Sequence, residues 1–558
     1  MRGLFLAVFA LLIVAGDSGR YVPQLIANAS KVLAPASLVS DSDPTEEASS
    51  ASVNAADGMA QVSGQDSTEF SPDAQTSANT ERFNNSDYHL KHDALALLWL
   101  AAKQGSEDAQ NRLLVEFERA YNAGFIATDY IDETTAIYFL EKLVNLENAD
   151  AAWLLYQILG EEGASQRFMR LAALGEVAEA QLAFAMSTDS PEKREKWLVR
   201  AASQNYVPAQ AALADWYLLH GQQQLAKPLL AATATLDMQS AFKYARLLWD
   251  EGEFSEAKQH FSFAAKKGHL QAEKALEAIN LYTPYSIEQA LRQSPSFNWE
   301  NEGKCLQRIQ PFATSLATIM RAHSLYNSFN NDQRLQNLSI CLAPPIWLKP
   351  DALSCDPDYK NAGILGCSIT PLASIAKKQK FSHAVVVAEQ GKANVQNGVM
   401  YLDISDAYSV FVHELAHFAG FADEYPIGKG MANRLCDEDG ISDFAPPNLI
   451  VDSEYWYAPH KTVENWLEID PATIIARAKT CTVLGENSYK PSRRITFMEH
   501  HDSGVIPPLY LVLWQQQLEK QNAQRPISMN FFQAFHNSGN QKEAAHWLAE
   551  YEAFTGGI

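Results

Sequence analysis

One stretch of the chain combines residue types and a spacing that could carry catalysis. Residues 405–425 read SDAYSVFVHELAHFAGFADEY and contain His413-Glu414-Leu415-Ala416-His417, an HExxH motif. Side chains at i and i+4 of a helix point the same way, so two imidazoles can bind one metal ion. Glu414 can take a proton from a water held by that metal. The motif therefore predicts a zinc site with a general base beside it.

A catalytic zinc site has three protein ligands and one open position, so a third ligand is expected after the helix. Gly420 can end the helix in a left-handed conformation and turn the chain back toward the metal. Asp423 follows three residues later and completes HExxHxxGxxD. A carboxylate in that place is a suitable zinc ligand.

The elements that must position this site can also be predicted. GVMYLDIS (398–405) follows the turn signal Asn397-Gly398 and is expected to be a strand. The helix should follow it, with Ser405 or Asp406 as its N-cap. The apolar positions of this helix have helical spacing: Ala407, Val410, Phe411, Leu415 and Phe418.

The region resembles the zincin metalloproteases, and within them the metzincin clan with its extended HExxHxxGxxH/D motif. GFADEY is also similar to the GLADEY-type sequence of the immunoglobulin-A peptidase-like family, which usually has one more residue before it. The resemblance implies Zn²⁺ and hydrolysis of peptide bonds, with His413, His417 and Asp423 as ligands and Glu414 as general base. The difference in spacing leaves Glu424 as the alternative third ligand.

Metzincins also place a methionine turn beneath the metal, for which Met431 and Met498 are the candidates. Met498 is preferred because Arg494–Phe497 is expected to be a short strand entering a turn, although either methionine could simply fill a core. His500 and His501 could orient substrate or stabilise an oxyanion, or could lie in solvent. For Tyr425, structural packing is favoured over oxyanion stabilisation.

Six cysteines lie at or after residue 305, and none forms a CxxC pair: Cys305, Cys341, Cys355, Cys367, Cys436 and Cys481. An even set confined to one half predicts a domain stabilised by disulfides in an oxidising compartment. Sequence alone does not choose the pairing, and latency through a free Cys436 is conceivable. The run Leu4–Ala15 after Met1-Arg2 predicts a signal peptide over 1–19, with an uncleaved N-terminal anchor as the alternative. A periplasmic or secreted protein is expected.

Length and charge exclude several classes of protein. The 558 residues carry a net charge of −22, which argues against binding to nucleic acid or to an anionic membrane surface. Such a length predicts two or three folded units. Residues 41–87 hold ten acidic residues and one arginine among small polar residues, so residues 20–87 are predicted to be a disordered acidic linker.

An alanine-rich motif repeats through the next part of the chain. It begins at Ala101, Leu143, Ala172, Ala201, Ala232 and Ala264, as in AAKQGSEDA and AASQNYVPA. A period near 30 residues made of helix pairs is typical of an α-solenoid. The motif resembles Sel1-like repeats, relatives of the tetratricopeptide family, over residues 88–285. That resemblance implies a surface for protein–protein contact.

After Pro284 the sequence has a mixed α/β character. LSICLA (338–343) and HAVVVAEQ (383–390) are expected to be strands, and 508–556 is expected to be helical. The predicted fold class is therefore an all-α solenoid of Sel1-like helix pairs followed by an α/β zincin-type metalloprotease domain over 286–558.

The resulting functional hypothesis is an exported zinc-dependent endopeptidase whose solenoid recruits a protein partner or substrate. Two alternatives remain open. One is a periplasmic interaction scaffold with an inactive or structural metal site, and the other is hydrolysis of a non-protein amide such as a peptidoglycan cross-link. Glu414 favours an enzyme, because a purely structural site does not need that base.

Overall fold

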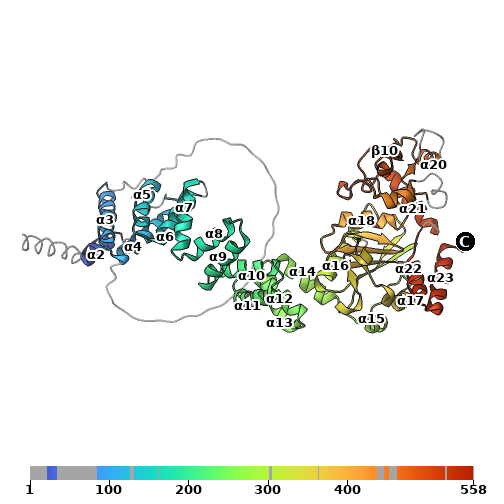
Figure 1. Cartoon of the computed structure of the whole chain (residues 1–558), viewed down its shortest axis with the longest axis horizontal. Coiled ribbons are helices and arrows are strands. Elements are labelled where there is room, and N and C mark those ends of the chain that lie inside the picture. The colour runs from blue at the N-terminus through green and yellow to red at the C-terminus, as the bar shows by residue number, and fades with distance from the viewer. Residues whose placement is uncertain are drawn as a thin grey trace, which may run out of the picture. The chain divides into compact units, whose positions relative to one another are not determined.

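The computed structural model describes residues 22–33, 85–125, 131–160, 163–300, 305–361, 363–436, 445–451, 461–521 and 524–556. The predicted signal peptide and most of the predicted linker lie outside these residues. The chain divides into two compact units, Met1–Ser240 and Ala241–Ile558 (Figure 1).

The linker prediction was wrong at both ends of the segment, since α3 already begins at Asn85. Residues Val22–Leu33 form helix α2, within the 20–87 segment predicted to be disordered. Ile26, Ala29 and Leu33 are buried in one core with residues of α3. Their spacing of three and four residues gives α2 one apolar face, and burying that face offsets the cost of ordering the segment.

The N-terminal unit is a succession of helices joined mostly by short turns (Figure 1). Its helices after α2 are α3 (Asn85–Lys103), α4 (Glu107–Asn122), α5 (Glu133–Val144), α6 (Ala149–Leu159), α7 (Gln166–Leu174), α8 (Ala178–Ser187), α9 (Pro191–Ser203), α10 (Val207–Leu219) and α11 (Gln223–Thr233). Three more helices follow: α12 (Met238–Asp250), α13 (Phe254–Lys266) and α14 (Leu270–Leu281).

Each of the six repeated sequences spans the turn of a helix pair, which confirms the helix-pair prediction. Four of the six turns share a backbone device, in which the amide of the residue entering the second helix bonds back five residues into the first, as Ser106 N does to Ala101 O at 3.2 Å. This closure needs a left-handed residue at the helix end. Residues with positive φ occupy that place in five of the six turns: Gly105, Glu147, Glu176, Asn205 and Gly268.

The alanines of the motif are fully buried where helices meet. Ala101, Ala109, Ala172, Ala180, Ala201, Ala209, Ala264 and Ala272 all have 0 % exposure. Small side chains let two helix backbones approach closely, which explains why the repeats retain alanine. Gly175 is closer still, since a Cβ built there would lie 2.3 Å from the Cβ of Ala149.

The C-terminal unit contains a mixed sheet with strand order β2-β1-β6-β8-β7, and β3 also pairs with β1. All pairings in it are parallel except that of the edge strand β7 with β8. The strands are β1 (Gln307–Ala313), β2 (Ile340–Leu342), β3 (Ile346–Trp347), β6 (His383–Ala388), β7 (Asn394–Gln396) and β8 (Val399–Asp403). The three strands expected at 338–343, 383–390 and 398–405 are therefore present.

The C-terminal unit contains further helices, and its other strands form two small sheets. The helices are α15 (Ile287–Gln293), α16 (Leu316–Asn331), α17 (Ala373–Gln379), α18 (Tyr408–His417), α19 (Lys429–Leu435), α20 (Lys461–Ile469), α21 (Pro508–Glu519), α22 (Ile527–Asn537) and α23 (Gln541–Thr555). The small sheets are β4 (Cys355–Asp356) with β5 (Gly366–Cys367), and β9 (Ile450–Val451) with β10 (Ala476–Ala478) and β11 (Ser488–Lys490). The helices expected within 508–556 are confirmed.

Strand β6 is buried along its whole length. Its residues Ala384 and Val386 belong to a core with Ile375 of α17, Phe531 of α22 and Trp547 of α23. Helix α16 also packs on β6 and β1, and it contacts α18. A strand apolar on both sides is typical of a parallel sheet packed between helices.

The compact C-terminal unit begins at Ala241, before the predicted boundary at 285/286, although the helix pairs themselves continue to Leu281. The last repeat helices pack against the α/β fold rather than only against other repeats. Helix α14 contacts α16, and the ring of Trp249 stacks on that of Trp347 in β3. Tyr285 forms a β-bridge with Leu348.

Three disulfides stabilise the C-terminal unit: Cys305–Cys341, Cys355–Cys367 and Cys436–Cys481. Disulfides of this number are typical of extracellular or periplasmic proteins. Because Cys436 is bonded to Cys481, it is not the free thiol that latency through this residue would require. Among the described helices, none is both long and apolar enough to cross a bilayer.

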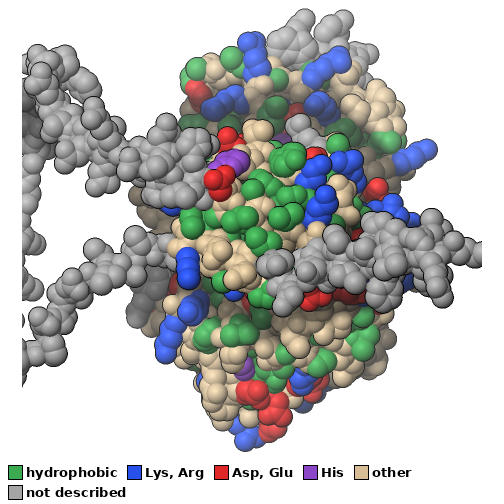
Figure 2. Space-filling view, turned by 90° about the vertical axis from the view of Figure 1, so that its left-hand side faces the viewer, with side chains coloured by type: hydrophobic (Ala, Val, Ile, Leu, Met, Phe, Trp, Pro, Cys, Tyr) green, Lys and Arg blue, Asp and Glu red, His purple; other side chains and the backbone are tan. Residues whose placement is uncertain are grey.

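The surface mixes side-chain types. On the face drawn in Figure 2, hydrophobic, basic and acidic side chains are interspersed. The described residues of that face form no continuous basic band of the kind that a phosphate backbone requires.

Close approach at Gly175 yields a stability prediction. Gly175→Ala should lower the free energy of unfolding by about 1–3 kcal/mol, because the added methyl overlaps Ala149 while the backbone φ of −83° is open to any residue. Lys267→Ala at the corresponding, exposed position of a later turn is the control and should change it by less than about 0.5 kcal/mol. Denaturation followed by circular dichroism measures both, and equal stability of the two variants would contradict the packing argument.

Candidate metal centre

Helix α18 carries the HExxH motif and starts four residues after β8. Phe411, Val412, Leu415 and Ala416 are buried, and the ring of Phe411 meets that of Phe329 in α16. These contacts fix which side of the helix faces the core, and with it the direction in which His413 projects.

The predicted N-cap of α18 was wrong. The capping position is Ala407, which makes no side-chain capping bond. Ser405 and Asp406 are used instead in the turn that ends β8: the Oδ1 atom of Asp403 accepts both of their amides, and Asp406 Oδ2 accepts the amide of Asp403 at 2.7 Å. A side chain engaged in that turn is not available to cap the helix.

The helix ends as expected. Gly420 has φ +80°, and the amide of Phe421 bonds back to Ala416 O at 3.3 Å. This reversal returns the chain toward the open side of His417, so that Asp423 lies beside both histidines.

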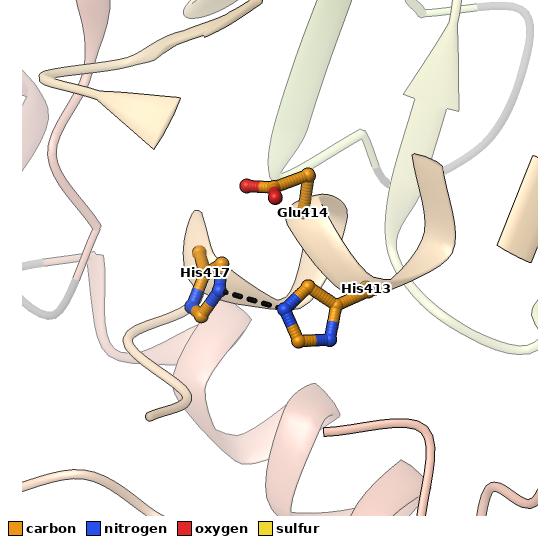
Figure 3. Close-up of side chains that lie close together, drawn as sticks. All are labelled: His413, Glu414 and His417. Atoms are coloured by element: carbon orange, nitrogen blue, oxygen red, sulfur yellow. Dashed lines mark hydrogen bonds between the residues drawn. The ribbon is translucent and has the colours of Figure 1, made fainter. Parts of the chain in front are cut away.

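Three electron-rich atoms converge at this point. His413 Nε2 lies 3.0 Å from Asp423 Oδ1, and His417 Nε2 lies 3.2 Å from the same oxygen. The two Nε2 atoms are 3.2 Å apart. Figure 3 shows the two imidazoles turned toward each other across one helical turn. The sequence-predicted set His413, His417 and Asp423 is therefore brought together.

The other ring nitrogens define the proton positions. His413 Nδ1 lies 2.9 Å from Phe497 O, and His417 Nδ1 lies 2.9 Å from Phe421 O. A carbonyl oxygen only accepts, so each Nδ1 carries a proton, and a neutral ring then has a bare lone pair at Nε2. Asp423 Oδ1 is buried and has no hydrogen-bond donor among the described residues. When both rings are neutral, three acceptors therefore face one another without a donor.

A cation satisfies this arrangement. Imidazole nitrogen and carboxylate oxygen are common zinc ligands, and a tetrahedral zinc ion with bonds of about 2.0–2.1 Å keeps its ligand atoms about 3.4 Å apart. The three measured separations of 3.0–3.2 Å are close to that value. The donor set therefore fits zinc with three protein ligands and one open position.

Glu414 lies beside this triangle and is 8 % exposed. Its carboxylate is within 4.8 Å of the histidine ring nitrogens, so it can be grouped with them as a potential ligand. Asp423 is closer to both rings, at 3.0 and 3.2 Å, and completes the triangle without it. Glu414 therefore lies next to the two imidazoles, and its carboxylate takes no part in the three-atom contact (Figure 3).

The charges in the site favour a positive charge where the three atoms meet. Burial opposes ionisation of Asp423, but His417 and His413 hold its pKa well below the ordinary value. Burial also opposes protonation of His417, but the Asp423 carboxylate outweighs it and raises the pKa of His417 to about 9. Burial raises the pKa of Glu414, which the two imidazoles partly offset.

The Glu424 carboxylate is fully engaged in hydrogen bonds within the protein. Glu424 is 0 % exposed, and its carboxylate accepts hydrogen bonds from Asn448, Lys490, Thr496 and Tyr510. A carboxylate has about four lone-pair sites, so all of them are occupied. Of the two alternatives for the third ligand, the geometry favours Asp423.

Met498 lies next to the centre, and Met431 does not share its burial. Met498 is 0 % exposed and its carbonyl accepts the amide of Glu424 at 3.0 Å, whereas Met431 is 57 % exposed on α19. Residues 497–499 form a turn as expected, but Arg494–Phe497 is not a strand. Its residues are instead used as acceptors and donors for the centre, as Phe497 O is for His413.

The remaining candidates lie at the edge of the centre. His501 Nδ1 lies 3.4 Å from the Oγ atom of Ser409, which is one helical turn before His413. The same nitrogen lies 2.9 Å from Asp502 Oδ1, and the ring of His500 stacks on that of His501. Tyr425 is 40 % exposed and its ring stacks on that of His413. Burial, with the charge of Asp423, raises the pKa of Tyr425, so it stays protonated.

Sequence reasoning missed the residues that hold the Asp423 segment. Thr480 Oγ1 donates to Asp423 O at 2.6 Å, and Asn448 bonds both main-chain atoms of Ala422. These residues lie 57 and 26 positions away from their partners and carry no local signal.

Among known proteins, the chain is similar to solved structures of repeat proteins. No family model matches the sequence, and no curated protein matches it. Among solved structures, a protective antigen of uropathogenic Escherichia coli strains with an SLR fold is 18 % identical over 36 % of this chain, with a TM-score of 0.28. This chain spans 45 % of that antigen's length.

Two other solved structures are similar to a comparable share of this chain. A Sel1 repeat protein from Oxalobacter formigenes is 17 % identical over 35 % of this chain and 89 % of its own, with a TM-score of 0.27. MamA is 17 % identical over 28 % of this chain and 96 % of its own length, with a TM-score of 0.21. Scores this low carry no argument, so the repeat architecture rests on the helices and turns described above.

Metal binding by the three-atom contact leads to a prediction. The full chain should bind one zinc ion, and Asp423→Asn should weaken binding by more than about 100-fold, beyond the loss typical of residues outside the ligand set. Asp502→Asn, which removes an exposed carboxylate near α18, should bind zinc as the wild type does. Titration against a chromophoric chelator measures all three.

Zinc should also raise the melting temperature of the wild type and of Asp502→Asn, but not of Asp423→Asn at the same free zinc. Equal zinc affinity of Asp423→Asn and wild type would exclude Asp423 as a ligand.

Proposed function

We propose that this protein is a zinc-dependent endopeptidase. The observation that carries the proposal is the convergence of His413 Nε2, His417 Nε2 and Asp423 Oδ1 within 3.2 Å, in a place where only a positive charge satisfies all three atoms. Three protein ligands are typical of catalytic zinc sites, whereas structural zinc sites have four. The resemblance to the metzincin motif supports the same conclusion.

Each residue has a role in peptide hydrolysis. Zinc at this site would polarise the scissile carbonyl and lower the pKa of water there. His413 and His417 can turn the lone pair of Nε2 to a metal because each Nδ1–H donates to a carbonyl, that of Phe497 or of Phe421. Glu414 accepts the proton of the attacking water and returns it to the leaving amine.

Burial suits Glu414 for this role. The raised pKa of a buried carboxylate makes it a stronger base than one in water, and hence a more effective proton acceptor. The neighbouring imidazoles of His417 and His413 lower the pKa of Glu414 and so favour its ionised form. Tyr425, exposed beside His413, is available to contact substrate.

The helix pairs are proposed to bind a protein partner or the protein substrate, because stacked repeats offer an extended surface. Three disulfides and the N-terminal apolar run support a periplasmic or secreted location. The rival function is an interaction scaffold with an inactive metal site, for which Glu414 would have no role. Hydrolysis of a non-protein amide would use the same residues.

Glu414 separates catalysis from metal binding. Glu414→Gln should keep one zinc ion per chain but lower the rate of peptide cleavage by about 10²–10⁴-fold, since the amide cannot accept the proton. Glu468→Gln on the exposed side of α20 is the control and should retain full activity. Fluorescent casein and a quenched peptide library serve as substrates, and elemental mass spectrometry gives the metal content.

Two results would contradict this function. Cleavage by zinc-loaded Glu414→Gln at the wild-type rate would exclude Glu414 as the base. A wild-type chain that holds zinc but cleaves neither substrate would favour the scaffold.

A further inference from the structure

Glu424, next to the third proposed zinc ligand Asp423, is a buried carboxylate that the proposed mechanism does not use. Asn448 Nδ2 and Tyr510 Oη donate to its Oε1 atom at 2.9 and 2.6 Å. Lys490 Nζ and Thr496 Oγ1 donate to its Oε2 atom at 3.0 and 2.5 Å. A carboxylate only accepts hydrogen bonds, so this environment has one donor for each lone pair.

The four donors come from separate parts of the C-terminal unit. Asn448 precedes β9, Lys490 ends β11, Thr496 stands before the Met498 turn, and Tyr510 is in α21. Lys490 is 2 % exposed, and its ammonium also donates to Glu499 Oε2 and to Arg494 O. Glu424, the residue that follows Asp423, therefore ties these four segments together.

The main chain on both sides of Asp423 is also held by hydrogen bonds, and Asn448 takes part in both sets. Asn448 bonds Ala422 N and Ala422 O, each at 2.9 Å. The amide of Glu424 donates to Met498 O at 3.0 Å, and the amide of Lys479 donates to Glu424 O at 2.9 Å. With its neighbours fixed, Asp423 has little freedom to move away from the histidines.

The Met498 turn links this arrangement to the first histidine. Phe497 O accepts the Nδ1 proton of His413, and the next carbonyl, that of Met498, accepts the amide of Glu424. One turn thus fixes the tautomer of His413 and the position of the chain that carries Asp423.

We infer that Glu424 is the positioning residue of the metal centre, holding the Asp423 carboxylate in register with the two imidazoles. The inference rests on the proposed zinc site. Outer partners of metal ligands typically change metal affinity by 10–100-fold when they are removed. A role in stability alone is the competing explanation, because breaking a buried ion pair is destabilising wherever it lies.

The test measures metal binding and ligand geometry, not activity. In Glu424→Gln, an NH2 group that only donates replaces one carboxylate oxygen. On that side of the amide, the bonds from Lys490 and Thr496, or those from Asn448 and Tyr510, cannot all remain. Zinc affinity should fall about 10–100-fold, and the visible absorption of the Co²⁺-loaded variant should differ from that of the Co²⁺-loaded wild type. Circular dichroism checks that the variant is folded.

Two further variants keep the test decisive. Glu543→Gln removes the carboxylate that pairs with Lys377, away from the centre, and should leave zinc affinity and the Co²⁺ spectrum unchanged. Tyr510→Phe keeps the buried ring but removes one donor to Glu424. It should weaken zinc binding several-fold, and it decides the question if Glu424→Gln does not fold.

The possible failures are distinguishable. A wild-type chain that binds no zinc would overturn the proposed function together with this inference. A wild-type chain that binds zinc, with folded Glu424→Gln matching it in affinity and Co²⁺ spectrum, would overturn the positioning role alone. Wild-type affinity in Tyr510→Phe, where Glu424→Gln does not fold, would do the same.

Discussion

The mutual repulsion of three electron-rich atoms constrains the whole C-terminal unit. His413 Nε2, His417 Nε2 and Asp423 Oδ1 lie within 3.2 Å of one another, and in the neutral rings the proton is on Nδ1, which donates to a carbonyl. Such a cluster is unfavourable in a buried setting unless a positive charge sits in it. The fold must therefore hold these atoms together until a cation or a proton neutralises them.

The surrounding structure supplies that restraint in layers. Pairing with the buried strand β6 positions β8, and α18 follows β8 in the chain. The core contacts of Phe411 and Leu415 then set the direction of the histidines. Asp423 comes from an irregular segment, which by itself would be poorly fixed. Its position depends on hydrogen bonds from Thr480 and Asn448, and the disulfide Cys436–Cys481 anchors the residue next to Thr480.

Features with a short sequence range could be predicted. The i, i+4 spacing of His413 and His417, the turn at Gly420 and the repeated helix turns depend on residues that are close in the chain. Features that depend on distant partners could not. The choice of Asp423 over Glu424 follows from donors such as Tyr510, 86 residues after Glu424, which occupy the Glu424 carboxylate. The boundary before Ala241 likewise depends on contacts such as that between Trp249 and Trp347.

Anomalous X-ray diffraction at the zinc edge from crystals of the zinc-loaded full chain tests the central claim most directly. The account predicts one strong anomalous peak at about 2.0–2.2 Å from His413 Nε2, His417 Nε2 and Asp423 Oδ1, with Glu414 outside the ligand set. A peak ligated by Glu414 or Glu424 in place of Asp423, or no peak between the two histidines, would contradict it.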